Sequence, residues 1–249
     1  MPFKNSELIK LKSTESTNLY AMNILKSNAL AEGSVVLTHS QTQGKGQGVN
    51  RWESEPGKNL TATIILYPGF LKPEDQFMLT RVVSLSVCSV LDKYEMPSRA
   101  MIKWPNDIYI NQRKIAGILI NNEITGTCIS TTIAGVGLNI NQESFSENAP
   151  GATSMKILTG IAYDLEKILS EWHESLEFWY KKLINSEFTT LEEKYLERMY
   201  LLNQPASYII KGNQMEATII GLAEYGMLML KDNSGKQYIC ALQEVVFVK

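Results

Sequence analysis

A proline turn between two apolar segments constrains the fold of this chain more than any other part of its sequence. Residues 103–107 read Lys-Trp-Pro-Asn-Asp; an apolar segment, a polar break at 111–113 and a second apolar segment at 114–120 follow. Proline fixes its own φ and favours an extended residue before it, and Asn and Asp tolerate tight turns. We therefore predict a strand, a turn and a returning strand, with polar side chains held at the strand ends.

The charges at these strand ends suit an anionic ligand. Lys103, Asp107 and Lys114 place a cation, a carboxylate and a second cation close to the turn. The carboxylate is able to orient a lysine or to hold Mg²⁺. Hairpins with exposed lysines are also common, so an ordinary surface hairpin is the alternative interpretation.

A glycine loop lies further towards the N-terminus. Three alternate glycines, Gly44, Gly46 and Gly48, surround a lysine. Their exposed N–H groups would form an anion-binding concavity with Lys45 and Arg51. The spacing matches neither G-x-G-x-x-G nor G-x-x-x-x-G-K-[ST], which excludes a Rossmann turn and a P-loop. A flexible loop without a ligand would have the same composition.

Residues 15–18, which read Glu-Ser-Thr-Asn, begin a predicted amphipathic helix that ends before Gly33. Ser16 is the predicted N-cap, because serine side chains satisfy the free N–H groups of a first helical turn. The same helix start offers hydroxyl, amide and backbone donors to a polar ligand group. Capping is the simpler interpretation.

Apolar periodicity predicts three further helices. The helix that follows residue 73 is apolar around most of its circumference, so we expect it to be deeply buried. A second helix, at 164–183, has one apolar face that should dock on the rest of the chain. Thr190 with Glu193 resembles a capping box that opens a last helix towards Tyr200.

Alternating or continuous apolar runs predict the strands of the same region. Two glycines, Gly135 and Gly137, lie in the last of these strands. A strand glycine marks either a close approach to the backbone or a bulge, and the sequence leaves both interpretations open. The predicted strands are 8–11, 34–38, 60–67, 100–103, 114–123 and 127–139.

Composition changes near Leu202, where a turn-rich sequence with five short strand-like segments begins. Turn signals at 212–213, 225–226 and 232–235 separate these segments. Short strands at this spacing are typical of a small barrel. We therefore predict two domains, residues 1–201 and residues 202–249.

Composition also excludes several classes of protein. The formal net charge of −2 gives no basic footprint, so duplex nucleic acid is not an expected partner. Cys88, Cys128 and Cys240 are scattered in apolar surroundings, which suits core thiols that stay reduced in a cytosol, and neither histidine has zinc-ligand spacing with them. Residues 1–12 lack the apolar core of a signal peptide, and no segment reaches transmembrane length. We predict a cytoplasmic protein with no membrane partner.

Five motifs in the same order resemble those of the bacterial biotin–protein ligases, over essentially the full length of the chain. The Lys-Trp-Pro-Asn-Asp block is the most specific of them, and the Gly-x-Gly pair is the least specific. The motifs are Glu15-Ser16-Thr17-Asn18, Gln41 with the loop from Gly44 to Trp52, Lys103-Trp104-Pro105-Asn106-Asp107, Arg113-Lys114-Ile115-Ala116-Gly117-Ile118-Leu119, and Gly135-Val136-Gly137-Leu138-Asn139.

The resemblance implies an α+β fold, in which a mixed β-sheet flanked by helices, as in class II synthetases, precedes a small SH3-like β-barrel. It also implies a two-step reaction. Biotin and MgATP would give biotinyl-5′-AMP and pyrophosphate, and a lysine of a biotin carboxyl carrier domain, from acetyl-CoA carboxylase or another biotin-dependent carboxylase, would then take the biotin. ATP and Mg²⁺ would be required, without assigned metal ligands. A homodimer is compatible with the family.

The resemblance assigns roles to the matching residues. Lys114 would stabilise charge on the reacting carboxylate and α-phosphate, and Lys45 and Asp107 would be the other catalytic residues. The biotin site would comprise Ser16, Thr17, Asn18, Gln41, Gly44, Lys45, Gly46, Gln47, Lys114, Gly117, Gly135 and Gly137. The ATP site would comprise Lys45, Gly46, Gln47, Trp52, Lys103, Asn106, Lys114 and Asn139.

Other functions fit parts of the same pattern. A lipoate–protein ligase or octanoyl/lipoyl transferase would share the fold and a similar lysine, but the Trp-Pro-Asn-Asp block, Lys114 and the predicted barrel favour biotin. A non-catalytic protein that binds biotinyl-adenylate would keep the pocket and lose the transfer step. Only about fifteen residues precede Ser16, fewer than a helix-turn-helix repressor module requires, so we expect no role in binding DNA.

The glycine loop departs from the family pattern at two places. Lys45 stands where the family commonly has arginine, and Gly48-Val49 stands where a variable residue and glycine are usual. Lysine keeps the positive charge but lacks the bidentate fork of arginine, and valine in place of glycine affects how the loop closes.

Replacing Lys45 by arginine should therefore strengthen retention of the acyl-adenylate severalfold, because a guanidinium can bind two phosphate oxygens at once. The measurement is the dissociation rate of preformed biotinyl-adenylate from the wild type and from Lys45→Arg. Equal rates in the two proteins would show that the loop does not use the second donor.

Overall fold

Two β-sheets with helices on both faces of the larger one make up the computed structural model, which describes residues 2–48, 50–147 and 149–248. The larger sheet has seven strands in the order β1-β2-β3-β7-β6-β5-β4. β1 and β2 are parallel and the other pairs are antiparallel, so the predicted mixed sheet is confirmed. Its strands are β1 (Leu8–Leu11), β2 (Val35–Thr38), β3 (Leu60–Leu66), β4 (Met101–Lys103), β5 (Asp107–Ile110), β6 (Arg113–Thr125) and β7 (Cys128–Leu138).

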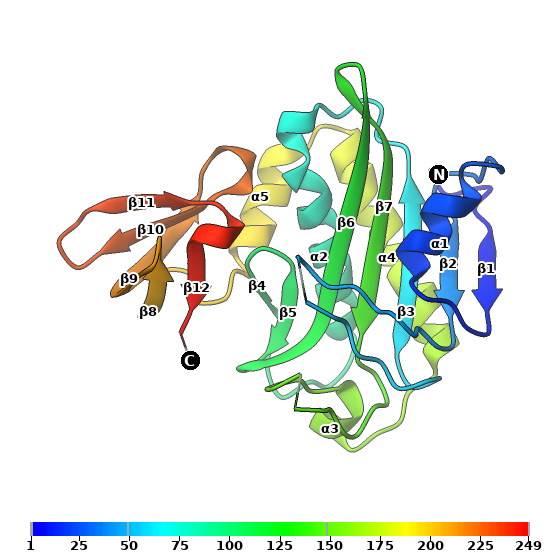
Figure 1. The fold of residues 1–249 in the computed structure, drawn as a ribbon, viewed down its shortest axis with the longest axis horizontal. Helices are drawn as coiled ribbons and strands as arrows, with labels where there is room; N and C mark the ends of the chain where they lie inside the picture. Colours follow the sequence, from blue (N-terminus) through cyan, green and yellow to red (C-terminus); the bar gives the residue numbers. More distant parts are fainter. Residues whose placement is uncertain (1, 49, 148, 249) are drawn as a thin grey trace.

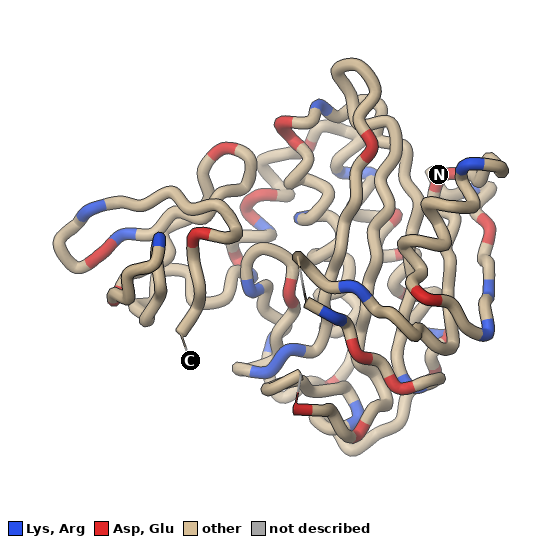
Figure 2. The backbone as a smooth tube through the Cα atoms, viewed as in Figure 1, with Lys and Arg blue, Asp and Glu red and all other residues tan. Residues whose placement is uncertain are grey.

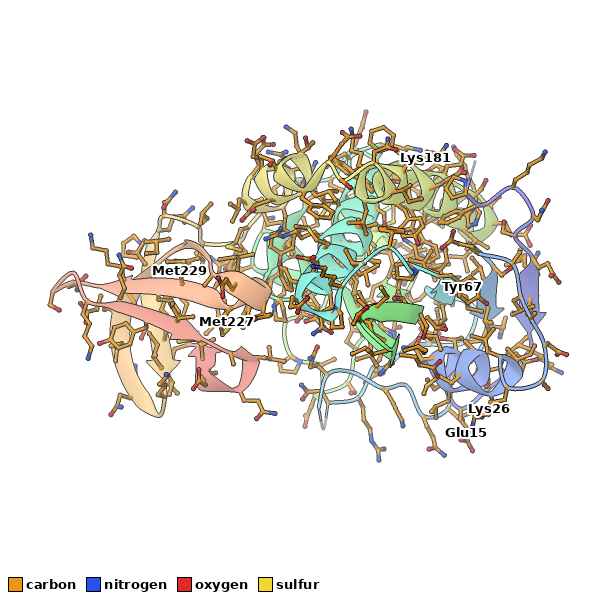
Figure 3. The ribbon with its side chains drawn as sticks, turned by 90° about the horizontal axis from the view of Figure 1, so that it is seen from above. Glu15, Lys26, Tyr67, Lys181, Met227 and Met229 are labelled. Atoms are coloured by element: carbon orange, nitrogen blue, oxygen red, sulfur yellow. The ribbon has the colours of Figure 1, made fainter. Side chains whose placement is uncertain are left out.

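Helices lie on both faces of the large sheet. α2 (Phe77–Leu91), α4 (Leu165–Ile184) and α5 (Phe188–Leu196) cover one face, and α1 (Thr17–Ile24) lies on the other (Figure 1, Figure 3). Glu15 and Lys26, just outside the two ends of α1, are on the side of the sheet opposite Lys181 of α4 (Figure 3). The short elements are α3 (Met155–Thr159), η1 (Pro73–Asp75), η2 (Glu224–Gly226) and η3 (Leu242–Glu244).

α2 is the helix that fills the space between the large sheet and the other helices. Nearly all of its side chains from Leu79 to Leu91 are buried, as its apolar circumference predicts. α4 docks through one face, where the fully buried Trp172 donates from Nε1 to Ser86 Oγ of α2 at 3.1 Å. Both predicted helices are confirmed. No helix in the described ranges is long and apolar enough to cross a membrane.

A separate antiparallel sheet of five strands forms the C-terminal part of the chain (Figure 1). Its order is β11-β10-β9-β8-β12, and each strand overlaps one of the five that the turn signals predict. The sheet is consistent with the predicted small SH3-like barrel, whereas the domain division at residue 202 stays a prediction. Its strands are β8 (Pro205–Ile210), β9 (Asn213–Leu222), β10 (Leu228–Asp232), β11 (Gln237–Cys240) and β12 (Val245–Phe247).

The predicted strand, turn and returning strand around residues 103–107 are confirmed as β4, β5 and β6. The turn, which contains a cis Trp104–Pro105 bond, also anchors the second sheet to the first. Trp104 Nε1 donates to Gly226 O at 2.8 Å. A Cβ on Gly226, where φ is +74°, would lie 2.2 Å from the ring of Phe77. The hydrophobic core therefore runs without a break from α2 into the C-terminal sheet.

The predicted capping of α1 is wrong, although the helix itself is confirmed. Ser16 stands at the N-cap position with an extended backbone, but its side chain makes no capping hydrogen bond. The backbone N–H of Thr17 donates instead to Gln41 Oε1 at 2.9 Å. A side chain from a distant loop therefore does the work that a local cap does in an isolated helix.

The last helix begins and ends earlier than its capping pattern predicts. α5 starts at Phe188, so Thr190 lies inside it and forms no capping box. Burial of Tyr195 against the core sets the position of the helix more strongly than a local cap. Tyr200, the predicted helix end, instead donates its backbone N–H to Ile102 O of β4 at 2.9 Å.

The three cysteines are free, as the sequence predicts, but they differ in exposure. Burial raises the pKa of the Cys88 thiol to about 12 and also raises the pKa of Cys240. Cys128, at the start of β7, is half-buried. The expectation of three core thiols is therefore wrong for Cys128, which lies near the tip of the β6–β7 hairpin.

Cys128 should be the one thiol of the native protein that reacts readily with an aromatic disulfide at neutral pH, because the thiolate is the reactive species and needs access to the reagent. Counting released chromophore before and after denaturation measures this. Cys128→Ser should lose the fast phase and keep the thiols that react only after unfolding. A fast phase that survives in Cys128→Ser would contradict the burial of Cys88 and Cys240.

Candidate active site

A cavity of about 760 Å³ is lined by the first turn of α1 and by the loop that joins β2 to β3. In Figure 1 this loop crosses in front of β6 and β7, on the side of the large sheet where α1 lies. The walls of the cavity come from α1, the glycine loop, the turn after β4, the first half of β6, the last residues of β7, the loop after β7, and η3 of the second sheet. This size and mixed lining suit a small-molecule ligand. The predicted site residues that line it are Ser16, Thr17, Asn18, Gln41, Lys45, Gly46, Gln47, Trp52, Asn106, Asp107, Lys114, Gly117, Gly135, Gly137 and Asn139.

Bare backbone forms the floor of the cavity. Gly117 of β6 is paired with Gly137 of β7, so neither strand presents a side chain at that point. The indole of Trp52 lies on this floor: a Cβ on Gly137 would be 2.2 Å from Trp52 Cε2, and a Cβ on Gly117 would be 3.1 Å from Cζ3. Of the two interpretations open for the strand glycines, the structure supports close approach to the backbone at Gly137.

The indole nitrogen of Trp52 has no partner on this floor. Trp52 Nε1 is buried, and it makes no hydrogen bond within the described residues. A buried donor without a partner costs about 1–3 kcal/mol. The resting position of the indole therefore carries a cost that a ligand with an acceptor could remove.

Lys114 and Asp107 form a charged pair at one end of the cavity, called here the lysine–aspartate centre. Lys114 Nζ lies 2.6 Å from Asp107 Oδ1, and the two side chains are 33% and 28% exposed. Asp107 therefore orients a lysine, which is one of the two roles that the sequence predicts for it. The ammonium also lies 5.8 Å from the centre of the Trp52 ring system, so cation, carboxylate and indole meet at one end of the glycine floor.

The backbone of Lys114 is held on both sides. It pairs with Tyr109 of β5 on one side, while its N–H donates to Gly151 O at 3.0 Å on the other. Its carbonyl accepts from Thr153 N at 2.8 Å.

Burial, and after it the charge of Asp107, raises the pKa of Tyr109 to about 12, so this cavity residue stays protonated at neutral pH.

The opposite end of the cavity is polar and uncharged. Thr17 and Asn18, in the first turn of α1, are buried. Gln41 reaches them through its Oε1, which accepts from Thr17 N. Gly135 makes room for this cluster, because a Cβ there would be 2.3 Å from Asn18 Oδ1.

The glycine loop covers the cavity as an irregular hairpin. Lys45 and Arg51 face each other across an isolated bridge, and Gly46 N donates to Asn50 O at 2.9 Å. Figure 2 shows basic positions in this loop, which crosses in front of the large sheet, and at the start of β6. Gln47 closes the loop onto the turn, since it accepts from Asn106 Nδ2 at 2.9 Å.

Two residues of the predicted site, Gly44 and Lys103, do not line the cavity. Gly44 lies off the cavity wall, and its role is steric, because a Cβ there would be 2.2 Å from Trp52 O. Lys103 also lies off the wall; its ammonium sits 5.1 Å from the Tyr109 ring and 4.8 Å from the Phe247 ring of β12. Val49 lies outside the described residues.

The cavity also contains residues that the motifs do not identify. Glu53 lies beside the glycine loop, and its carboxylate accepts from the backbone N–H and the hydroxyl of Ser146. This ties the glycine loop to the loop after β7. Only long-range contacts place these residues, so no local sequence signal could have found them. The further lining residues outside the motifs are Thr61, Tyr109, Phe145, Ala149, Pro150, Ala152, Leu242 and Gln243.

Asn139, just after β7, lines the cavity and carries a buried side-chain acceptor. It is only 2% exposed, and its Nδ2 donates to Thr153 O at 3.0 Å. Within the described parts of the chain its Oδ1 has no partner. A buried carbonyl oxygen without a donor is costly, so this position suits a ligand that carries an N–H group.

Comparisons with known proteins point to one family. A sequence model of the biotin/lipoate A/B protein ligase family matches residues 10–139. The chain is 28% identical over 240 residues to a biotin–[acetyl-CoA-carboxylase] ligase of Paracoccus denitrificans, covering 94% of this chain and 98% of that protein. It is also 28% identical over 224 residues to biotin–protein ligase 1, chloroplastic, of Arabidopsis thaliana, of which it spans 58%. The fold resembles that of a biotin protein ligase from Aquifex aeolicus in complex with biotin and ATP, with a TM-score of 0.80, 24% identity, and 98% of this chain and 99% of that chain covered.

Replacing Gly137 by alanine should lift the Trp52 indole off the cavity floor, because the new methyl group would overlap the ring. Overpacking of this kind costs about 1–3 kcal/mol if the ring stays in place. We expect acrylamide to quench the fluorescence of Gly137→Ala more strongly than that of the wild type. Gly69→Ala is the matched control, since a Cβ at Gly69 has no neighbour within 4 Å.

The other tryptophans are controlled for by repeating the comparison in a Trp52→Phe background. There Gly137→Ala should change the quenching constant very little. An equal rise in both backgrounds would show that a different tryptophan responds.

Proposed function

The chain belongs to the biotin/lipoate A/B protein ligase family, and from this membership and the chemistry of the cavity we propose that it is an ATP-dependent biotin–protein ligase. One observation carries the proposal. The cavity brings a lysine–aspartate centre, a bare glycine floor and an uncharged polar pocket into one space, although they come from motifs spread over more than a hundred residues.

The proposed reaction has two steps. A biotin carboxylate oxygen attacks the α-phosphorus of ATP, the bond to the β-phosphate breaks, and pyrophosphate leaves. The ε-amine of a carrier lysine then attacks the acyl carbon, the carbon–oxygen bond to AMP breaks, and the amine loses a proton as the amide forms. Neither step requires a covalent intermediate on the enzyme.

Lys114 is the proposed catalytic cation. The first step concentrates negative charge between the carboxylate and the α-phosphate, and a fixed cation lowers the energy of that arrangement. Backbone bonds on both sides and the 2.6 Å contact with Asp107 hold Lys114 in place. Asp107 is therefore the proposed positioning partner of the lysine, and exposed Lys45 would approach the phosphates from the loop side.

The uncharged end of the cavity favours biotin over lipoate. The ureido ring of biotin carries N–H donors and a carbonyl acceptor, whereas the dithiolane ring of lipoate carries neither. Thr17, Asn18 and Gln41 offer hydroxyl and amide groups at that end. Polar groups that are buried need partners, so a ligand without hydrogen-bonding atoms would cover the Gln41 amide nitrogen and the free lone pair of the Thr17 hydroxyl without giving either a partner.

The other end suits the nucleotide. Asn139 Oδ1, buried and without a partner among the described residues, could accept from the amino group of adenine. The indole of Trp52 offers an aromatic face for stacking, provided that it exchanges its contact with the glycine floor for one with the ligand. Glycine-loop N–H groups and Lys45 supply the contacts expected for phosphates.

Magnesium fits this cavity as an ion carried mainly by the phosphates. Within the described residues no cluster of three histidine, cysteine, aspartate or glutamate side chains could hold a metal. Asp107 and Glu53 are carboxylates of the cavity wall, and Asp107 is already paired with Lys114. Mg²⁺ usually takes one or two protein carboxylates and keeps several waters. When bound, it would neutralise phosphate charge.

The proposed protein partner is a biotin carboxyl carrier domain, whose lysine must reach the cavity from solvent. Leu242 and Gln243 bring the second sheet to the cavity wall, so the carrier would meet both parts of the chain. A homodimer and a cytoplasmic location also stay predictions. The exposed edge strand β1 is the element that would allow strand pairing between two copies.

ATP-dependent transfer of biotin to a purified carrier domain tests the function directly, with lipoate assayed in parallel. We expect transfer of biotin alone, and a loss of at least about 100-fold in Lys114→Ala, because a fixed cation contributes that much to a charged transition state. Lys181→Ala, on the opposite face of the sheet, is the control and should be as active as the wild type.

Other outcomes would identify the alternatives. If the adenylate forms and no carrier is labelled, the protein binds biotinyl-adenylate without transferring it. Transfer of lipoate in place of biotin would overturn the substrate assignment and leave the fold unchanged.

A further inference from the structure

A buried threonine of the central sheet lies directly behind the uncharged end of the cavity. Thr63, on β3, is fully buried and does not line the cavity itself. Its Oγ1 is 2.7 Å from Thr17 Oγ1 and 2.7 Å from Asn18 Oδ1. Thr63 therefore touches two residues of the cavity wall at once, although none of the motifs contains it.

The orientation of the Asn18 amide is fixed by its other contacts. Asn18 Nδ2 donates to Leu119 O at 3.0 Å and to Asn121 Oδ1 at 3.2 Å. The amide nitrogen therefore faces β6, and the amide oxygen must face Thr63 and the backbone of Gly135. A flipped amide would place the Asn18 oxygen against two other acceptors, Leu119 O and Asn121 Oδ1.

A count of hydrogens then fixes the direction of each bond. Thr63 has one hydroxyl hydrogen, and Asn18 Oδ1 can only accept, so that hydrogen must point to Asn18. The 2.7 Å contact between the two threonine hydroxyls is a hydrogen bond only if Thr17 donates to Thr63. The distance of 3.4 Å from Thr17 Oγ1 to Gln41 Oε1 is too long to compete.

The direction of these bonds determines which hydrogen-bond donors and acceptors Thr17 and Gln41 offer to a ligand. The hydrogen of the Thr17 hydroxyl is used inside the protein, so the hydroxyl can only accept from a ligand. Gln41 Oε1 is taken by Thr17 N, which leaves the Nε2 group of Gln41 to donate. An acceptor and a donor therefore stand side by side, and a cyclic urea offers the complementary N–H and C=O.

We propose that Thr63 is a positioning residue that holds the Thr17 hydroxyl as an acceptor and so selects a ligand ring that carries an N–H group. The inference rests on the proposed function and extends it. It attributes the preference for a urea ring to Thr63, a side chain that does not line the cavity. Removing the Thr63 hydroxyl frees the Thr17 hydrogen and leaves Asn18 Oδ1 without a donor.

Thr63→Val and Thr63→Ser test this, because valine has the same shape as threonine without the hydroxyl and serine keeps the hydroxyl. We expect Thr63→Val to raise the KM for biotin about 10-fold or more, the size expected when a buried polar contact is lost. The KM for ATP and kcat of Thr63→Val should stay within about twofold of the wild-type values. Thr63→Ser should have the wild-type KM for biotin.

Thr132→Val is the matched control. Thr132 is also fully buried in the large sheet, and its Oγ1 donates to an asparagine side chain, Asn122 Oδ1, at 2.8 Å. It lies outside the cavity wall. Thr132→Val should lower the melting temperature much as Thr63→Val does and leave both KM values unchanged, which separates positioning from general loss of stability.

The outcomes separate this inference from the function it rests on. If the wild type transfers no biotin, the proposed function fails. If the wild type is active and Thr63→Val keeps its KM for biotin, or loses affinity for biotin and ATP equally, the positioning role is overturned. Thr63→Ala makes the same test if Thr63→Val does not fold, since it too lacks the hydroxyl.

Discussion

The pairing of two glycines across β6 and β7 is the constraint on which the candidate site depends. Because Gly117 and Gly137 face each other in the sheet, the strands leave a strip of bare backbone in a surface that side chains would otherwise fill. Every other feature of the cavity is placed relative to that strip. The indole of Trp52 lies on it, Lys114 stands at one end, and the polar cluster around Asn18 stands at the other. A flat ring can be held between backbone below and a loop above only where this strip exists.

The site divides into a rigid part and a covering part. Lys114 belongs to the rigid part, since strand pairing on one side and the segment around Gly151 on the other fix its backbone. The cover is the glycine loop, and the side chains of Gln47 within it and of Glu53 just after it contact the rest of the chain. Chemistry that develops charge at a fixed point requires the cation to be in position beforehand, whereas entry of a ligand requires a cover that can move. Lys114, in the paired strand β6, meets the first requirement, and the glycine loop, outside the sheet, is the segment available for the second.

The sequence predicts the elements well where their stability is local or depends on continuous apolar surface. The strand, turn and returning strand around Pro105, the buried helix α2 and the five C-terminal strands are all present as predicted. Predictions that depended on local capping were wrong, because Gln41 supplies the partner that Ser16 was expected to provide and because burial of Tyr195 sets the position of α5. The position of Lys103 and the lining by Leu242 were not predictable, since their contacts or surroundings come from segments more than a hundred residues away along the chain.

The contact between Trp104 and Gly226 connects the C-terminal sheet to the turn that forms part of the cavity wall. The turn that carries Asn106 and Asp107 is held from behind by this hydrogen bond and by the packing of Phe77 against Gly226. The small sheet therefore helps to hold Asp107, and through it Lys114, in position. Shortening the chain before β8 would remove a support of the active site, and an apparently accessory module would prove inseparable from the chemistry performed some 120 residues earlier in the sequence.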